Sequence, residues 1–79
     1  MFALYDTFND RIISRHRKIN RVVRACLEIN RMMTCGAYLP MTIKLIDSEG
    51  DIKNVDDETL EEFQYSYDKF CNSPLSEIK

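Results

Sequence analysis

His16 and Ser14 are the side chains whose types and spacing come closest to a catalytic pair in this sequence. An imidazole within hydrogen-bonding reach of a hydroxyl group is the arrangement that activates a serine nucleophile. Both residues lie in a stretch with helical periodicity, where side chains two positions apart point about 200° apart. We therefore expect that the two do not pair, that His16 has a structural or interface role, and that the protein is not an enzyme.

The other side chains that bind metals do not have the spacing of a metal site. A zinc site needs a full set of Cys or His ligands, whereas the chain has one histidine and three scattered cysteines, Cys26, Cys35 and Cys71. The carboxylates between positions 47 and 58 lack the spacing of a calcium-binding EF-hand loop, and roles in turns and helix caps explain them. We expect no metal and no cofactor. The odd number of cysteines predicts free thiols in a reducing cytoplasm.

The length of the chain, 79 residues, predicts a single domain. A domain of this size buries only about 60% of the surface of its unfolded chain, so its stability is marginal. The content of 44% hydrophobic and 30% charged residues excludes disorder throughout the chain. No apolar run approaches the roughly 18 residues of a membrane span, and residues 1–5 carry no charged leader. We therefore expect neither a membrane protein nor a signal peptide.

The strongest pattern predicts one long amphipathic helix over residues 11–33. Its apolar arc contains Ile12, Ile19, Val22, Val23, Cys26, Leu27, Ile29 and Met33. The opposite side is a basic stripe of Arg17, Arg21, Arg24 and Arg31. Arg15 and His16 interrupt the arc near its start, so the first turns are expected to overhang the domain and to contact a partner. Gly36 is expected to end the helix as a left-handed cap.

A β-hairpin is predicted over residues 41–55. Residues 41–46 largely alternate between apolar and polar side chains, as in a half-buried strand. The acidic run 47–51 is expected to form the turn, with Gly50 supplying a positive φ, and residues 52–55 to form the return strand.

A second helix is predicted after the hairpin, with Asp56 as its N-cap. Val55 and Leu60 have the spacing of a hydrophobic staple across this cap, and Pro74 cannot continue the helix. The predicted buried face consists of Leu60, Phe63, Tyr67 and Phe70.

Together these elements predict one α+β domain over residues 1–79. It has a long N-terminal amphipathic helix, a two-stranded antiparallel hairpin and a C-terminal helix, in the order α-β-β-α. The apolar N-terminal segment 1–10 is expected to fold back onto the core, and residues 73–79 to be a frayed tail.

Charge is distributed unevenly along the chain. Residues 1–35 contain seven Lys or Arg and three Asp or Glu, whereas residues 36–79 contain four and ten. The first half therefore has a net charge of +4 and the second half one of −6, within a total of −2. Internal compensation between two solvated faces accounts for part of this pattern. The alternative is that one charged surface meets a partner.

Two candidate surfaces follow from this asymmetry. The basic one comprises the stripe of Arg17, Arg21, Arg24 and Arg31, with Arg15 and His16 at the overhang. The acidic one comprises Glu49, Asp51, Asp57, Glu58, Glu61 and Glu62. Asn30 and His16 also lie at core-like positions, where a polar residue can specify packing on a second chain, so a homodimer stays an open alternative.

These features favour a non-enzymatic cytoplasmic protein that acts by binding another protein. In size and general character the chain is similar to the small accessory or inhibitor proteins of bacteriophages and mobile elements. The alternative is a nucleic-acid-associated regulator that uses the basic face of the long helix. A sequence pI of about 5.3 argues against that alternative, because dedicated nucleic-acid binders are usually basic.

Overall fold

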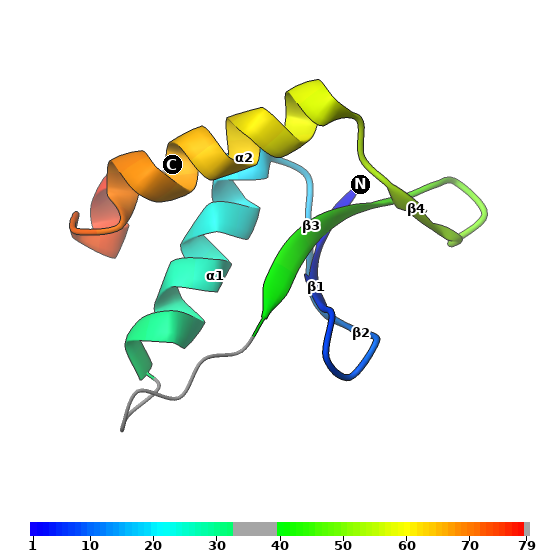
Figure 1. The fold of residues 1–79 in the computed structure, drawn as a ribbon, viewed down its shortest axis with the longest axis horizontal. Coiled ribbons are helices and arrows are strands. Elements are labelled where there is room, and N and C mark those ends of the chain that lie inside the picture. The colour runs from blue at the N-terminus through cyan, green and yellow to red at the C-terminus, as the bar shows by residue number, and fades with distance from the viewer. Residues whose placement is uncertain (33–39, 79) are drawn as a thin grey trace.

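The computed structural model describes residues 1–32 and 40–78, and the order of their elements is β-β-α-β-β-α (Figure 1). The predicted α-β-β-α order is therefore wrong, although the fold is α+β. The elements are β1 (Phe2–Asp6), β2 (Arg11–His16), α1 (Ile19–Met32), β3 (Met41–Ile46), β4 (Ile52–Asn54), α2 (Asp57–Phe70) and the short 3-10 helix η1 (Leu75–Glu77). The expected cap at Gly36 lies outside the described residues.

The predicted long helix over residues 11–33 is divided into a strand and a shorter helix. Residues 11–16 form β2, and α1 begins only at Ile19. The adjacent β-branched residues Ile12 and Ile13 favour an extended backbone, but Ile12 also falls within the helical arc that follows. Pairing with β1 decides between the two conformations, and helical periodicity within residues 11–33 cannot detect a partner that lies outside that stretch.

The N-terminal segment is the centre of the sheet rather than a segment folded back onto it. β1 pairs antiparallel with β2 on one side and with β3 on the other, in the strand order β2-β1-β3-β4. The strands β2 and β3 therefore run parallel to each other on either side of β1, and α1 connects them. A continuous apolar run such as residues 2–5 is typical of a strand that is buried on both sides.

Both helices cover the same face of the sheet (Figure 1). Leu4 pairs with Ile43 in the register of β1 and β3, and both side chains are almost fully buried against this helical layer. The buried core cluster consists of Leu4, Val22, Val23, Cys26, Leu27, Ile43, Phe63 and Ile78. Strand alternation places Ala3 and Tyr5 on the opposite face, which neither helix covers.

The predicted hairpin is confirmed by the antiparallel pairing of β3 with β4, and Gly50 has the expected positive φ of 87°. The cap of α2 is also confirmed, because the Asp56 side chain accepts a hydrogen bond of 2.8 Å from the backbone N–H of Thr59. Of the residues predicted to line the inner face of α2, Phe63 is buried, whereas Leu60 is 43% exposed.

The last residues were expected to fray, but the structure gives them a place in the core. η1 follows Pro74, and the backbone N–H of Ile78 donates to the carbonyl of Leu75 over 3.1 Å. Ile78 is only 1% exposed and belongs to the core cluster, with Leu75 packed beside it. Two apolar residues in a short stretch after a proline are too few to establish a periodicity, so the sequence pattern did not predict this contact.

Candidate functional site

The candidate site lies where β2, the outer strand of the sheet, leads into α1. The connection consists of Arg17 and Lys18, and both of these side chains are exposed. The helix α1 then packs against β1 and β2, so its first turn returns to the end of β2. Residues that were predicted to follow one another along a single helix are therefore brought together from two elements.

Ser14 and His16 form a hydrogen bond, with 2.8 Å between Ser14 Oγ and His16 Nε2. The prediction that they do not pair is therefore wrong, because residues two apart in a strand point to the same face. Among the described residues, Ser14 is the only hydrogen-bond partner of the His16 imidazole. The sequence signal was present, in the form of the Ser-x-His spacing, but it was assigned to the wrong secondary structure.

Two effects lower the pKa of His16 below its usual range. The larger is burial, and the smaller is the positive charge of Arg21 on α1. Both disfavour the imidazolium form, so His16 is neutral near pH 7. A lowered pKa also makes the imidazole a weaker proton acceptor, and neither of the two surface hollows described below includes His16. The hydrogen bond to Ser14 therefore positions the imidazole between β2 and α1.

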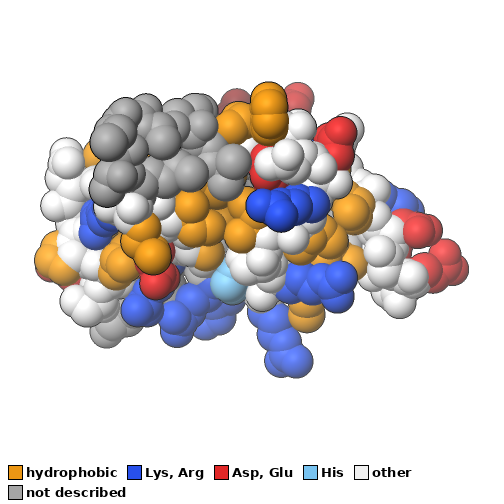
Figure 2. Space-filling view, turned by 90° about the horizontal axis from the view of Figure 1, so that it is seen from below, with side chains coloured by type: hydrophobic (Ala, Val, Ile, Leu, Met, Phe, Trp, Pro, Cys, Tyr) orange, Lys and Arg blue, Asp and Glu red, His pale blue; other side chains and the backbone are white. Residues whose placement is uncertain are grey.

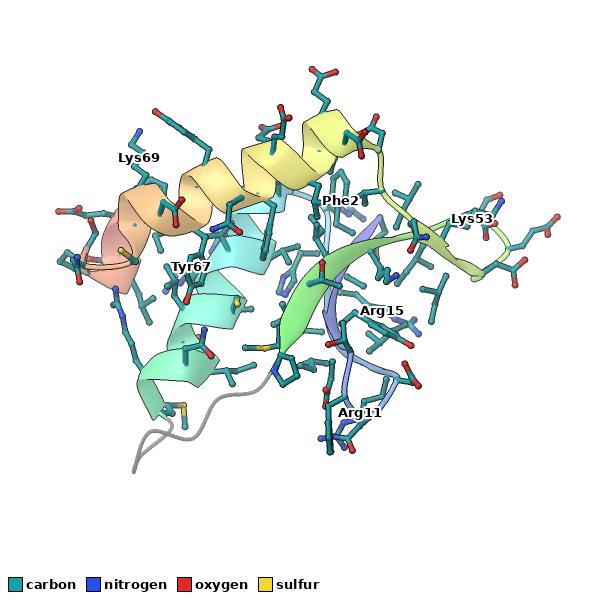
Figure 3. The ribbon with its side chains drawn as sticks, viewed as in Figure 1. Phe2, Arg11, Arg15, Lys53, Tyr67 and Lys69 are labelled. Atoms are coloured by element: carbon teal, nitrogen blue, oxygen red, sulfur yellow. The ribbon has the colours of Figure 1, made fainter. Side chains whose placement is uncertain are left out.

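Five cations lie at or near this junction, and we call them the basic face. It consists of Arg15, Arg17, Lys18, Arg21 and Arg24. Arg15 pairs with Ala3, so it points away from the helices, as Figure 3 shows, whereas Arg21 is close enough to His16 to lower its pKa. Figure 2 shows Lys and Arg side chains on both sides of the single histidine. The basic face therefore surrounds the edge of β2 and creates a positive potential there.

Arg31, the last member of the predicted basic stripe, binds backbone carbonyls at the end of α2. Its guanidinium group donates to the carbonyl oxygens of Phe70 and Cys71 over 3.2 and 3.1 Å, and also to that of Ser73. These carbonyls lie at and beyond the C-terminal end of α2, where a cation is favoured by the helix dipole. Arg31 therefore connects the end of α1 to the end of α2 and is separate from the basic face.

Asn30, which suggested contact with a second chain, is also satisfied within the chain. Its amide donates to the hydroxyl group of Tyr67 over 3.0 Å and to the sulfur of Cys26 over 3.8 Å. Tyr67 lies between α1 and α2 in Figure 3. Asn30 is thus a polar contact between the two helices.

The acidic residues singled out in the sequence lie in two groups, and all six are exposed. Glu49 and Asp51 are in the β3–β4 turn, whereas Asp57, Glu58, Glu61 and Glu62 are in the first turns of α2. Within the turn, Asp47 accepts backbone hydrogen bonds from residues 49 and 51, and it forms a 3.1 Å ion pair with Lys53. Glu49 and Asp51 therefore lie towards the edge of the sheet opposite β2, whereas Glu62 lines one surface hollow together with Lys18 of the basic face.

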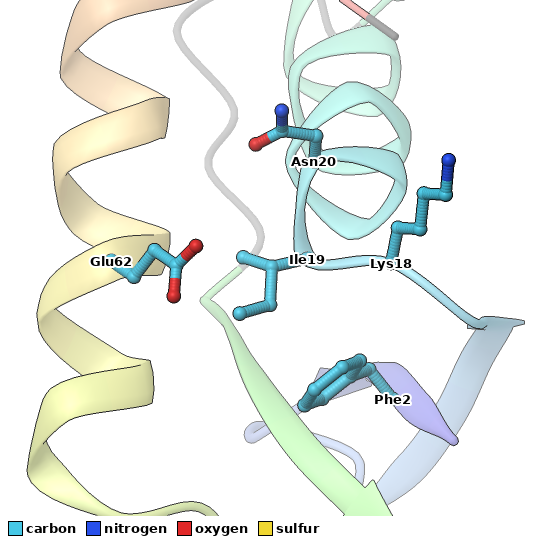
Figure 4. A pocket seen from close by; sticks show the side chains of 5 residues that line it. All are labelled: Phe2, Lys18, Ile19, Asn20 and Glu62. Carbon is cyan, nitrogen blue, oxygen red and sulfur yellow. The ribbon is translucent and has the colours of Figure 1, made fainter.

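Two shallow hollows are lined by described residues. One lies between β1, the start of α1 and α2, and is lined by Phe2, Lys18, Ile19, Asn20 and Glu62. Figure 4 shows the carboxylate of Glu62 pointing towards Ile19, with the Lys18 side chain directed away. The other lies along α2 and is lined by Asp57, Leu60, Glu61 and Gln64. Neither hollow is lined by a Ser, Cys or His side chain.

Asp6 is a buried carboxylate that holds the turn from β1 into β2, and the sequence pattern did not identify this role. Its side chain is fully buried and accepts hydrogen bonds from the backbone N–H groups of Phe8 and Asn9 and from the amide of Asn9. Arg11 adds an ion pair at 3.6 Å. The run Asp-Thr-Phe-Asn-Asp between two apolar segments is a turn signature.

These donors lower the pKa of Asp6, with the side-chain hydrogen bond from Asn9 as the largest cause. The pKa of Asp47 is lowered mainly by a hydrogen bond from the Asp51 backbone, and the pKa of Asp56 mainly by hydrogen bonds from Thr59. A carboxyl group whose pKa is lowered by folding stabilises the protein at pH values above the pKa of the unfolded state, which is 3.8 here. That stability is lost as the pH falls through the pKa of the folded state.

We therefore expect the melting temperature of the protein to fall as the pH is lowered below about 4. The Asp6→Asn variant should melt at a lower temperature at neutral pH and should show a smaller further decrease in acid, because one of the three linked carboxyl groups is absent. Thermal denaturation followed by circular dichroism between about pH 7 and pH 2 tests this expectation. Equal melting temperatures of the wild type at both ends of that range would contradict it.

The thiols have no assigned chemistry at this site. Cys26 and Cys71 are free, and burial raises the pKa of Cys26 to about 11, which makes it unreactive at neutral pH. In the regions that the structure describes, no group of His, Cys, Asp and Glu side chains has the geometry to hold a metal ion. The same regions contain no helix whose length and apolar character would let it cross a membrane.

Comparisons with known proteins assign this chain to no family. No family model matches it, and neither the characterised proteins nor the solved structures include a significant match. The fold and the site therefore define only a small α+β class of protein, with two helices on one face of a four-stranded antiparallel sheet and a basic face around an edge strand.

Proposed function

We propose that the protein acts by binding an acidic surface of another protein through its basic face. The observation that supports this most directly is the gathering of Arg15, Arg17 and Arg21 around the exposed edge of β2. Complementary charge guides association and selects partners, and arginine is favoured at protein interfaces. Such a role fits a small accessory or inhibitor protein of the kind that bacteriophages encode, working by contact and without catalysis.

A protein partner is favoured over nucleic acid by the rest of the surface. The exposed carboxylates of the β3–β4 turn and of α2 make the whole chain slightly negative, and they would repel an extended polyanion. A folded partner can contact the basic face alone. Because Asn30 is satisfied by Tyr67 within one chain, this proposal does not require a homodimer.

Reversing one charge of the basic face should weaken partner binding by about tenfold, because an attraction becomes a repulsion. The variant is Arg21→Glu, and the matched control is Lys69→Glu, the same change at an exposed position of α2. Figure 3 shows Lys69 on the side of the molecule opposite Arg15. The measurement is affinity capture from a lysate of the native host, with bound proteins quantified by mass spectrometry. If Arg21→Glu captured the partner as well as the wild type does, the proposal that the basic face binds the partner would be rejected.

The second candidate is a nucleic-acid-associated regulator that uses the same face. The specific observation in its favour is that several cations lie together in spite of the acidic pI, as Figure 2 shows. A protein that binds duplex DNA in this way loses affinity with salt, with a log–log slope of about −0.9 per phosphate contact. Electrophoretic shift of labelled DNA and RNA at low salt separates the two candidates. The absence of any shift removes this one.

A further inference from the structure

Within residues 1–32 and 40–78, no strand pairs with the outer edge of β2, and this edge is the longer of the two edges of the sheet. β2 has six residues and pairs with β1 on one side, whereas β4, at the other edge, has three. A strand at an edge carries backbone N–H and C=O groups that are free to pair with another chain. The edge of β2 therefore offers backbone donors and acceptors beside the basic face.

The register of the sheet shows which backbone groups point outward. Met1 and Thr7 bond to Ile46 and Pro40, on the β3 side of β1. Because the direction alternates along a strand, the even-numbered residues of β1 bond to β2. The pairs Phe2–His16 and Leu4–Ser14 are thus hydrogen-bonded pairs. Arg15 lies between them on β2, so its N–H and C=O point away from the sheet.

The charges on this edge restrict what can pair with it. Two copies of β2 side by side would bring arginines close to arginines, which is unfavourable. A strand with carboxylates would instead place opposite charges near Arg15 and Arg17. The irregularity opposite Leu4 and Tyr5 leaves Ile13 without a partner in β1, and a bulge of this kind bends the strand. Pairing is therefore confined to the half of the edge beyond the bulge.

We propose that the outer edge of β2, from Ser14 to Arg17, receives an extended acidic segment of the partner protein as a fifth strand of the sheet. This inference rests on the proposed function and adds its mode: backbone pairing gives affinity, and the arginines select an acidic sequence. Nucleic acid would use the same cations without needing the backbone N–H of Arg15. A requirement for that N–H therefore distinguishes strand addition from contact by charge alone.

The test compares Arg15→Pro with Arg15→Ala. Both variants remove the guanidinium group, but only proline removes the outward N–H, and an edge strand tolerates proline at such a position. The probe is a short synthetic peptide in which glutamate alternates with valine, and binding is measured by fluorescence anisotropy. We expect Arg15→Ala to bind a few-fold more weakly than the wild type. Arg15→Pro should be weaker than Arg15→Ala by a further factor of about ten.

A second measurement protects the test against misfolding of the proline variant. The same peptide, N-methylated at alternate backbone positions, keeps its charges but cannot form a ladder of hydrogen bonds. It should bind the wild type at least about tenfold more weakly than the parent peptide. Equal binding of the two peptides, equal binding by the two Arg15 variants, or no binding of the parent peptide to the wild type would overturn strand addition.

These results separate the two proposals. If Arg21→Glu abolishes partner capture while the two Arg15 variants behave alike, the basic face binds a partner through side chains and strand addition is rejected. If Arg21→Glu has no effect on capture, the proposed function itself is rejected. If both Arg15 variants bind an oligonucleotide more weakly than the wild type, and by the same factor, that result would also count against strand addition.

Discussion

Replacing Phe63 by alanine is expected to lower the free energy of unfolding by about 3–5 kcal/mol. Phe63 is 6% exposed and is the contribution of α2 to the core cluster, beside Val22 and Val23 of α1. Removing the ring leaves a cavity in the core where α2 packs on α1. The total stability of so small a domain is of similar size, so the variant should be partly or wholly unfolded near room temperature.

The measurement is urea denaturation followed by circular dichroism, with Tyr65→Ala as the matched control. Tyr65 is an aromatic residue of the same helix that is 68% exposed, and its replacement should change stability by no more than about 0.5 kcal/mol. The pair of variants separates burial of the ring from helix propensity. If Phe63→Ala unfolded at the same urea concentration as the wild type, the packing of α2 on α1 would be wrong.

Replacing Leu4 by alanine is expected to cost about 2–5 kcal/mol, the second large effect. Leu4 is fully buried on the central strand of the sheet, paired with Ser14 on one side and with Ile43 on the other. Its side chain lies where β1 meets the helical layer, so the surrounding strands cannot easily close the cavity. This prediction also tests the fold, since residues 1–10 were expected to fold back onto the core and instead supply an inner strand of the sheet.

Leu60→Ala is the matched control for this experiment. It removes the same atoms from a side chain that is 43% exposed, on the outer part of α2. We expect a loss below about 1 kcal/mol, because exposed positions contribute little. Had the sequence-based assignment of Leu60 to the buried face been right, its replacement would cost as much as that of Leu4. A larger loss for Leu60→Ala than for Leu4→Ala would therefore contradict the sheet arrangement.

The candidate site was predicted in part, and for a reason that proved incomplete. Arg15 and His16 were singled out because they interrupt a helical arc, which predicted contact with something outside the chain. In β2 the same two residues alternate between opposite faces of a strand, and this alternation explains the interruption without any overhang. Arg17, Arg21 and Arg24 were grouped by helical periodicity, whereas the structure groups them with Arg15 through the return of α1 to β2.

Two contacts near the site could not be predicted from periodicity. Arg31 repeats with the spacing of the basic stripe, yet it binds backbone carbonyls about forty residues later in the chain. Asp6 is acidic in a mainly apolar segment, yet it is fully buried because Phe8, Asn9 and Arg11 satisfy it. In both cases the partner is a polar group whose position depends on the tertiary structure, which neither composition nor periodicity predicts.

By itself the sequence determined what depends on neighbouring residues. Capping by Asp56, the turn at Gly50 and the extended conformation of residues 41–46 involve groups a few positions apart, and these predictions are confirmed. The alternation predicted within residues 41–46 is not confirmed, because Ile43 and Ile46 are the two buried residues of β3. The uneven distribution of basic and acidic residues is likewise a property of the sequence, although the structure brings Lys18 and Glu62 to one surface hollow.

Only the tertiary structure decided the conformation of residues 1–16. The apolar pattern of residues 11–16 fits a helix as well as a strand, and the choice depends on hydrogen bonds to β1, which itself pairs with β3 about forty positions later in the chain. Long-range pairing supplies backbone partners that a short segment cannot provide for itself. The same pairing makes β2 an edge strand and places Ser14 against His16. It thereby turns part of a predicted helical stripe into a basic face around an open strand.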